Sequence, residues 1–176
     1  QIMDALAAGC DAAVQMIDSS VVRVHQHGAC IADNIHQDMG RSRGGLTTKI
    51  HALVDARGRP IKLQLTAGEK SDIASAQSLI ADLPVGAMLI ADKGYDANAL
   101  REAVRERKAW ANIPPKANRR DPICFSKHLY KARNLVERFF NRIKQFRRIA
   151  TRYDKLAENF LAAVKLAAVR VWLRDL

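Results

Sequence analysis

The sequence has few cysteines, no long hydrophobic run and no secretory signal. Its three cysteines, Cys10, Cys30 and Cys124, are odd in number and widely spaced, which favours reduced thiols in a cytosol over a disulfide framework. No apolar run approaches the roughly 20 residues that a membrane-spanning helix needs, and no leader with an apolar centre is visible. We therefore expect a cytoplasmic protein that neither spans a membrane nor depends on disulfides.

Acidic residues are almost missing from one stretch of the chain. Residues 115–152 contain twelve Lys or Arg but only two acids, Asp121 and Glu137, so that 12 − 2 = +10 of the formal net charge of +11 lies there. The sequence pI is about 10.0. This excess of one sign predicts a polyanionic partner. Nucleic acid fits better than an anionic membrane surface, because the sequence contains no candidate membrane span.

The length predicts a single domain. A chain of 176 residues with 48% hydrophobic residues can bury one sizeable core, and a second full domain is not expected. We divide it into a lead-in over 1–13, a sheet with its first helices over 14–113, a basic linker loop over 114–129 and a helical part over 130–176. The opening Gln-Ile-Met is compatible with the C-terminal part of a longer protein and with an internal start at Met3.

Hydrophobic periodicity predicts a group of strands followed by alternating strands and helices. Alternating or β-branched runs between turn residues predict strands over 14–18, 21–24, 47–54, 61–65, 88–91 and 110–113. Apolar residues at helical spacing predict helices over 71–81 and 96–107, a basic helix around Glu137 and an apolar helix over 156–173. This order is typical of an α/β fold with a mixed sheet flanked by helices on both faces.

Two aspartates each follow an apolar strand. Asp18 comes after residues 14–17 and Asp92 after residues 88–91, and either aspartate alone is most simply a turn or cap residue. If the two strands are neighbours, the carboxylates lie side by side at the rim of the sheet, and the following basic helix can bring Glu137 to them. Three such acids would form an oxygen-ligand site for two Mg²⁺ ions, which suits phosphoryl transfer.

Glu137 lies within the basic helix. A helical spacing of about 100° per residue places Tyr130, Arg133, Glu137 and Lys144 on one side and apolar residues on the other. An apolar side that packs on a core and a cationic side that displays a carboxylate suit an enzyme acting on a polyanion. A solvated helix with an Arg133–Glu137 ion pair explains the same pattern, so the helix alone leaves both interpretations open.

Several blocks of the sequence together resemble a known family. The pattern Tyr130-x-x-Arg133-x-x-x-Glu137, followed by Lys144, resembles the signature around the catalytic glutamate of DDE transposases from bacterial insertion sequences of families four and five. The resemblance covers nearly the whole chain. Further blocks similar to family five occur, in the family's order, at residues 17–20, 40–51, 91–96 and 145–155.

This resemblance implies a ribonuclease-H-like fold and a specific reaction. Asp18, Asp92 and Glu137 would hold two Mg²⁺ or Mn²⁺ ions. The domain would then cleave DNA at transposon ends and transfer the strands into target DNA.

The resemblance also implies partners. Tyr130, Arg133 and Lys144 would position double-stranded DNA near the cut, and a dimer would hold two transposon ends together in a bacterial nucleoid. Family members carry an N-terminal region before the first aspartate, and some are split over two reading frames. This chain can therefore be interpreted as the product of the downstream reading frame of a split gene. The product of the upstream reading frame would then be its partner.

Further arginines are candidates for contacts with DNA phosphates. Arg41 and Arg43 stand beside a glycine pair whose N–H groups can cradle phosphate, although a plain glycine turn explains the same residues. Arg147, Arg148 and Arg152 are expected to extend the basic helix and to add phosphate contacts.

Lys49 and His51 share one face of a predicted strand. They would meet DNA if that face borders the end of the Asp18 strand, and they would be solvated otherwise.

Two rival functions stay open on sequence grounds. One is a non-catalytic DNA-binding remnant or accessory protein of an insertion sequence. The other is a nuclease with the same fold and metals but no joining step. The presence of all three acids favours the catalytic interpretation.

Overall fold

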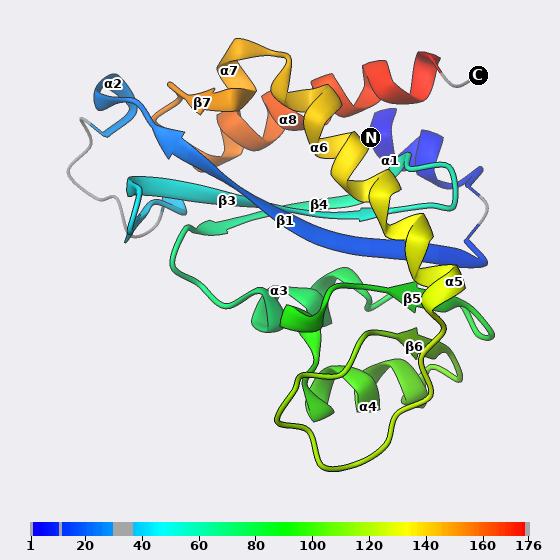
Figure 1. The fold of residues 1–176 in the computed structure, drawn as a ribbon. Coiled ribbons are helices and arrows are strands. Elements are labelled where there is room, and N and C mark those ends of the chain that lie inside the picture. The colour runs from blue at the N-terminus through cyan, green and yellow to red at the C-terminus, as the bar shows by residue number, and fades with distance from the viewer. Residues whose placement is uncertain (1, 11, 30–36, 175–176) are drawn as a thin grey trace.

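The structure, a computed structural model, describes residues 2–10, 12–29 and 37–174, so that Cys30 lies outside the described residues. A mixed sheet crosses the molecule, with helices on both sides of it (Figure 1). The strands are β1 (Val14–Val24), β2 (Gly40–Ser42), β3 (Gly45–Val54), β4 (Pro60–Ala67), β5 (Met88–Ile90), β6 (Trp110–Asn112) and β7 (Thr151–Arg152). The α-helices are α1 (Ile2–Ala7), α2 (Gln26–Ala29), α3 (Asp72–Leu79), α4 (Asn98–Glu106), α5 (Lys127–Tyr130), α6 (Asn134–Lys144), α7 (Arg147–Ala150) and α8 (Ala157–Arg174).

The sheet combines an antiparallel half with a parallel half. Its order over the described residues is β2-β3-β1-β5-β6, with β4 also paired to β3 and β7 also paired to β1. β1 pairs antiparallel with β3, and β3 pairs antiparallel with β4. β1 pairs in parallel with β5, and β5 pairs in parallel with β6. The central strand β1 therefore joins the hairpin part of the chain to the part built from helical crossovers.

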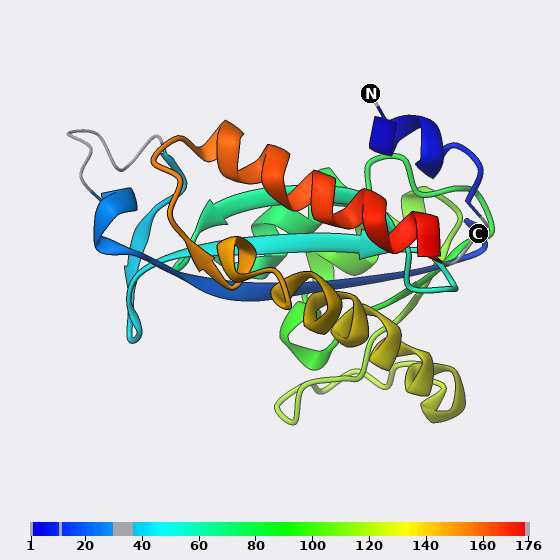
Figure 2. The same ribbon diagram turned by 90° about the horizontal axis from the view of Figure 1, so that it is seen from above.

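Two hydrophobic cores lie on opposite faces of the sheet. One contains Met16 of β1 together with Phe139 of α6 and buried residues of α8, and Figure 2 shows α6 and α8 lying across this face. The other contains Ile17 of β1 together with Leu100 of α4 and buried residues of α3. Adjacent residues enter different cores because side chains alternate across a strand. The predicted mixed sheet with helices on both faces is confirmed. No helix in the described ranges is both long and apolar enough to cross a membrane.

β1 is longer than the sequence predicts. A break at Ser19 and Ser20 was expected from their turn-forming character, but both serines pair with β3, opposite His51 and Ile50. The ladder between β1 and β3 runs without a break from Met16 to Arg23. The backbone of β1 is therefore paired with β3 on both sides of the two serines. Asp18 consequently lies inside an eleven-residue strand and not at its end, which corrects the prediction.

The basic helix is interrupted. The sequence predicts that it continues through Arg152, but α6 ends at Lys144 and α7 begins at Arg147. Phe146 adopts an extended backbone between the two helices. This turn allows Ile149 of α7 to enter the core and directs the chain into β7, which pairs with the end of β1.

Arg152 is fully buried. Its guanidinium donates hydrogen bonds to Thr48 Oγ1 (2.7 Å) and to the carbonyl oxygens of Gln37 (2.8 Å), Asp154 (2.9 Å) and Lys155 (3.0 Å). Burial lowers the pKa of Arg152 to about 10, so the group is still charged at neutral pH. The expectation that Arg152 contacts DNA phosphate is therefore wrong, because its charge is used to join β3, β7 and their flanking loops.

Asp96 anchors the basic linker loop. The sequence predicts a helix that begins at about Asp96, but the N-cap of α4 falls on the next residue. Its carboxylate instead accepts hydrogen bonds from Arg101 Nε (2.9 Å), Arg119 Nε (2.8 Å) and the backbone N–H of Lys116 (2.8 Å). Burial acts to raise the pKa of Asp96, but these hydrogen bonds lower it to about 2. Two of the basic residues near the loop are thus held by a buried acid.

Replacing Arg152 with Ala should lower the free energy of unfolding by about 3 kcal/mol or more, because the buried Thr48 hydroxyl and three part-buried carbonyl groups lose their donor. Urea unfolding measures this loss. Arg147→Ala is the matched control, since Arg147 is exposed on the preceding turn, and it should change the midpoint little. Equal effects of the two substitutions would contradict the structural role of Arg152.

Candidate active site

The pairing of β1 with β5 brings Asp18 and Asp92 together. Met16 pairs with Ile90 in this parallel ladder, and each aspartate lies two residues further along. Residues at i and i+2 share a face of a strand, so both carboxylates are on the α6 side of the sheet, as Met16 and Ile90 are. The prediction that these strands are neighbours is confirmed.

Asp92 is oriented by the turn that follows it. Its Oδ1 accepts a hydrogen bond from the Gly94 N–H at 2.7 Å and caps the 3₁₀ turn η2 (Lys93–Tyr95). A Cβ at position 94 would lie 2.9 Å from the same oxygen, so the absence of a side chain permits this approach. One oxygen of Asp92 is therefore fixed toward the backbone of its own turn.

Arg133 joins Asp18 to Glu137. It ends the 3₁₀ turn η3 (Lys131–Arg133) directly before α6. Its Nη1 donates to Asp18 Oδ2 at 2.9 Å, and its Nη2 contacts Glu137 Oε1. Asp92 interacts electrostatically with both Asp18 and Arg133. Arg133 thus bridges Asp18 of β1 and Glu137 of α6, and the ladder between β1 and β5 brings Asp92 beside Asp18.

The electrostatics of this group favour a cation. Burial raises the pKa of Asp18; the Ser19 N–H and Arg133 lower it, and the charges of Asp92 and Glu137 raise it again. Carboxylates that repel one another are stabilised by a cation between them, and an all-oxygen donor set suits Mg²⁺ or Mn²⁺.

The acids do not form a closed ligand cluster as they stand. Across the described ranges, no three His, Cys, Asp or Glu side chains are grouped closely enough to hold an ion. Arg133 supplies the positive charge between Asp18 and Glu137 in this arrangement. The carboxylate oxygens are donors that suit a divalent ion. The guanidinium of Arg133 lies between Asp18 and Glu137, where these carboxylates would also contact a cation.

Tyr130 and Lys144 flank the acids. The Tyr130 ring centroid lies 5.7 Å from Arg133 Cζ, which places the ring beside the guanidinium. Lys144 is two turns after Glu137 on the same helix side, and its Nζ donates to the Val21 carbonyl oxygen at 3.1 Å. Burial lowers the pKa of Lys144. Tyr130 therefore lies beside Arg133, whereas Lys144 contacts β1 three residues beyond Asp18, roughly 10 Å along the strand.

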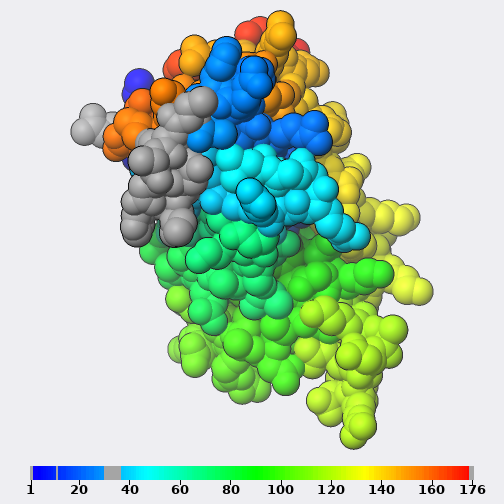
Figure 3. Space-filling view, turned by 90° about the vertical axis from the view of Figure 1, so that its left-hand side faces the viewer, coloured from blue at the N-terminus to red at the C-terminus, as the bar shows by residue number. Residues whose placement is uncertain are grey.

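Arg41 and Arg43 extend from the β2–β3 hairpin. Both are exposed, and Figure 3 shows the end of the molecule that carries this hairpin beside α2. The Gly44 N–H donates to Ser42 Oγ at 3.2 Å, and Gly45 has a positive φ of 93° that suits glycine. The glycine pair therefore forms a hairpin turn, and the two arginines are its charged groups.

Arg148 and the hairpin lie toward the far end of β1 from Asp18. Arg148 is 73% exposed, and its Nη2 donates to Asp154 Oδ1 at 3.2 Å. It precedes β7, which pairs with β1 at Arg23, and Arg23 Nε donates to the Gly44 carbonyl oxygen in the hairpin at 3.2 Å. Since Arg23 is five residues beyond Asp18, these cations lie roughly 17 Å along the strand from the acids.

Lys49 and His51 lie under α3. Ser19 pairs with His51, whereas Asp18 pairs with Ala52, so strand alternation places Lys49 and His51 on the opposite face of the sheet from Asp18. Lys49 is 9% exposed and His51 is fully buried. The structure corrects the expectation that this face meets DNA or solvent, because a covered side chain presents no atom to a duplex.

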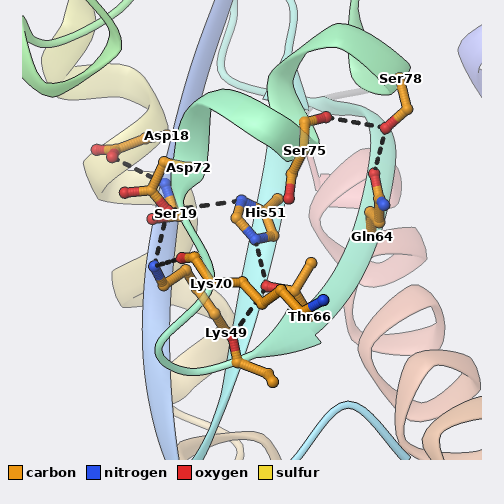
Figure 4. Close-up of polar contacts among 11 residues, drawn as sticks. Asp18, Ser19, Lys49, His51, Gln64, Thr66, Lys70, Asp72, Ser75 and Ser78 are labelled. Carbon is orange, nitrogen blue, oxygen red and sulfur yellow. Dashed lines mark hydrogen bonds and ion pairs between the residues drawn. The ribbon is translucent and has the colours of Figure 1, made fainter. Parts of the chain in front are cut away.

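The same two residues belong to a buried polar cluster shown in Figure 4. Lys49 Nζ lies 3.0 Å from Asp72 Oδ1, which also accepts a hydrogen bond from Ser19 Oγ at 2.9 Å. His51 Nε2 lies 2.8 Å from Thr66 Oγ1. Sequence reasoning assigned Asp72 only to the start of a helix and missed its link to Ser19, because 53 positions separate the two residues. One signal in the sequence points to such a partner. Lys49 and His51 lie on the same face of a strand, and two polar side chains need hydrogen-bond or ion-pair partners if that face is covered.

His51 is held in its neutral form. Thr66 Oγ1 donates to the Ala67 carbonyl oxygen at 3.2 Å, so we assign the proton of the His51–Thr66 bond to Nε2. His51 Nδ1 is then a buried acceptor without a hydrogen-bond donor among the described residues. Burial lowers the pKa of His51 to about 4, although Asp72, 3.9 Å from Nδ1, acts to raise it.

Comparison with known proteins adds family information to this geometry. A family model described as transposase DDE domain matches residues 10–172. The chain is 40% identical over 130 residues to the "Putative transposase for insertion sequence element IS6501" of Brucella ovis, which covers 73% of this chain and 100% of that protein. It is 31% identical over 105 residues to the transposase for insertion sequence element IS1106 of Neisseria meningitidis serogroup B, covering 56% of this chain and 36% of that protein.

The fold is also found among solved structures. The chain resembles a piggyBac transposase in a synaptic complex with hairpin DNA, with a TM-score of 0.54 and 10% identity. The superposition covers 93% of this chain and 47% of that chain. This likeness identifies the fold as ribonuclease-H-like, as the sequence resemblance implies.

The free energy of unfolding should fall as the pH is lowered from about 6.5 to about 4. The pKa of His51 is about 4 in the fold and near 6.5 in an unfolded chain. Stability from the neutral imidazole is therefore complete above pH 6.5 and decreases through this window as the unfolded state takes up a proton, by at most about 3 kcal/mol.

Urea unfolding over this pH range, compared between the native chain and His51→Gln, measures the effect. The variant should lose much of the pH dependence. His128→Gln is the control, since His128 is exposed. A His51 variant whose stability keeps the native pH dependence would contradict the assignment.

Proposed function

Because the chain belongs to the transposase DDE domain family, we propose that it is a transposase catalytic domain that cuts DNA at transposon ends and joins them to target DNA. Residues 1–176 act in this proposal as one catalytic domain, working on DNA in the bacterial cytoplasm. The reaction is hydrolysis of a phosphodiester that frees a 3′-OH, followed by attack of that 3′-OH on a target phosphodiester. The observation that carries the proposal is the Arg133 bridge between Asp18 and Glu137, with Asp92 beside Asp18 across the ladder between β1 and β5.

We assign Asp18, Asp92 and Glu137 as the residues that hold two divalent cations, Mg²⁺ or Mn²⁺. Such ions activate a water or hydroxyl nucleophile and stabilise the departing oxygen in phosphoryl transfer. The all-oxygen donor set and the mutual repulsion of the acids support this assignment.

Arg133 has two positions in this proposal. Without metal it neutralises Asp18 and Glu137. When those carboxylates bind cations, the guanidinium turns to a DNA phosphate, which is an anion with the same bidentate geometry. Tyr130 beside it and Lys144 next to β1 contact the DNA on either side of the cut.

The more distant cations extend the DNA contact. Arg41, Arg43 and Arg148 lie roughly 17 Å from the acids, which corresponds to about five base pairs at 3.4 Å per pair. A duplex whose cleaved phosphate lies at the acids therefore reaches the hairpin and α7. These contacts carry affinity and little sequence information.

The proposed assembly is a dimer on DNA that holds two transposon ends and then binds a target duplex. The upstream reading-frame product is its proposed protein partner, because the resemblance is to a family in which some members are split over two reading frames. A non-catalytic DNA-binding remnant would keep the basic surface but show no metal-dependent chemistry, so an assay of cleavage separates the two functions.

Asp92→Asn and Glu137→Gln should each reduce cleavage and joining of a labelled duplex carrying the element's end by about 100-fold or more, because each removes a ligand charge worth several kcal/mol in the transition state. The assay uses Mg²⁺ or Mn²⁺ and counts cleaved and joined products on a denaturing gel. Asp82→Asn is the matched control, since Asp82 is an exposed acid paired with Lys62. Products that persist in both site variants would overturn the assignment, and joined products distinguish a transposase from a simple nuclease.

Duplex binding by the native chain should weaken steeply with salt. If about six cations contact phosphates, the slope of log K against log salt should be near −0.9 × 6, roughly −5. Fluorescence anisotropy between about 0.05 and 0.3 M salt measures it. Arg43→Gln should make the slope shallower by about one, whereas Arg152 is buried and contributes no phosphate contact. A slope near zero would contradict binding through the basic surface.

A further inference from the structure

We infer that Asp72 is a positioning residue that holds Asp18 in its arrangement from the opposite face of the sheet. The inference rests on the proposed function, because the arrangement matters for holding divalent cations. Asp72 is the first residue of α3. Its side chain is 34% exposed, and its carboxylate contacts Lys49 of the sheet.

The link runs from Asp72 to Asp18 through Ser19. Ser19 Oγ donates to Asp72 Oδ1 at 2.9 Å, and the Ser19 N–H donates to Asp18 Oδ1 at 2.8 Å. Figure 4 shows Ser19 between the two aspartates. The side chain of Ser19 is therefore fixed on the α3 side, while its amide fixes one oxygen of Asp18 on the α6 side.

Tyr95 packs the Asp92 turn on the α3 side of the sheet. Tyr95 belongs to the 3₁₀ turn that Asp92 caps, and its side chain is 1% exposed. Burial raises the pKa of the Tyr95 phenol, and the charges of Asp72, Asp18 and Asp92 raise it further. The ring packs the turn into the core that also contains buried residues of α3, and its hydroxyl has no hydrogen-bond partner among the described residues.

Lys49 holds Asp72 in place. Its Nζ lies 3.0 Å from Asp72 Oδ1 and donates to the Lys70 carbonyl oxygen at 2.7 Å. The ammonium therefore ties β3 to the loop that leads into α3. The neutral ring of His51 fills the space behind this pair, with Nδ1 3.9 Å from the same oxygen of Asp72. Asp72 is consequently a fixed point against which Ser19 can be oriented.

Groups behind a metal ligand commonly set its orientation, and their loss lowers metal affinity by about 10- to 100-fold. Ser19 and Asp18 point to opposite faces of β1, so a contact that orients Ser19 on the α3 side acts on the Asp18 carboxylate through the Ser19 amide. Ser19→Ala and Asp72→Asn should therefore each lower the affinity for Mn²⁺ by about tenfold. The Mn²⁺ signal in electron paramagnetic resonance, titrated on the full chain without DNA, measures this affinity directly.

A double-variant cycle separates positioning from general loss of stability. If Asp72 acts through Ser19, the double variant that carries both Ser19→Ala and Asp72→Asn should bind Mn²⁺ about as weakly as either single variant. Thr66→Val removes the hydroxyl partner of His51 and lowers stability without touching Ser19, so its Mn²⁺ affinity should stay within about twofold of native. Native affinity in Asp72→Asn, or an equal loss in Thr66→Val, would overturn the inference.

A second readout requires no metal. The Ser19 amide should exchange with solvent about tenfold faster in Asp72→Asn than in the native chain, as measured by NMR, because its bond to Asp18 loses support. Thr66→Val should leave the exchange at this amide close to native. A native chain that binds no Mn²⁺ would overturn the proposed metal site, and the amide exchange would then still decide whether Asp72 positions Asp18.

Discussion

The parallel ladder between β1 and β5 is the constraint on which the candidate site depends. It is short, running from Val14 to Met16 on β1, and it ends just before the two aspartates. The strands therefore bring Asp18 and Asp92 together where the ladder no longer ties their backbones to each other. Everything else in the site is added to this pair: Arg133 brings α6 and Glu137 to it from one face, and α3 supports it from the other.

The distribution of positive charge has two physical roles. Some cations are enclosed by hydrogen-bond acceptors and join elements of the fold, as Arg152 does among four oxygen atoms and Arg119 does at Asp96. Others, such as Arg43 and Arg148, are exposed and are available to a polyanion. A formal charge of +11 therefore overstates the number of phosphate contacts, since enclosed guanidinium groups would first have to leave their acceptors.

The sequence predicts the fold class and the three acids because these depend on local patterns: strand periodicity, helix faces and the spacing from Tyr130 to Glu137. It does not predict which strand face is covered. The burial of Lys49 and His51 follows from the docking of α3, and the burial of Arg152 follows from the pairing of β7 with β1. Both are contacts between distant segments, for which a single sequence has no periodic signal. The catalytic roles of the acids are still predictions, whereas the pairing of the two aspartate strands and the Arg133 bridge from Asp18 to Glu137 are features of the structure.

The acids are far apart in the chain, and this has a consequence for protein synthesis. Asp18 and Arg133 are separated by 115 positions, and Val21 and Lys144 by 123. During translation the antiparallel strands can pair early, because their contacts are local. The last acid is recruited only after α6 has left the ribosome. A polypeptide that ends before α6 therefore carries the two aspartates without Glu137 and without the arginine that bridges it to Asp18.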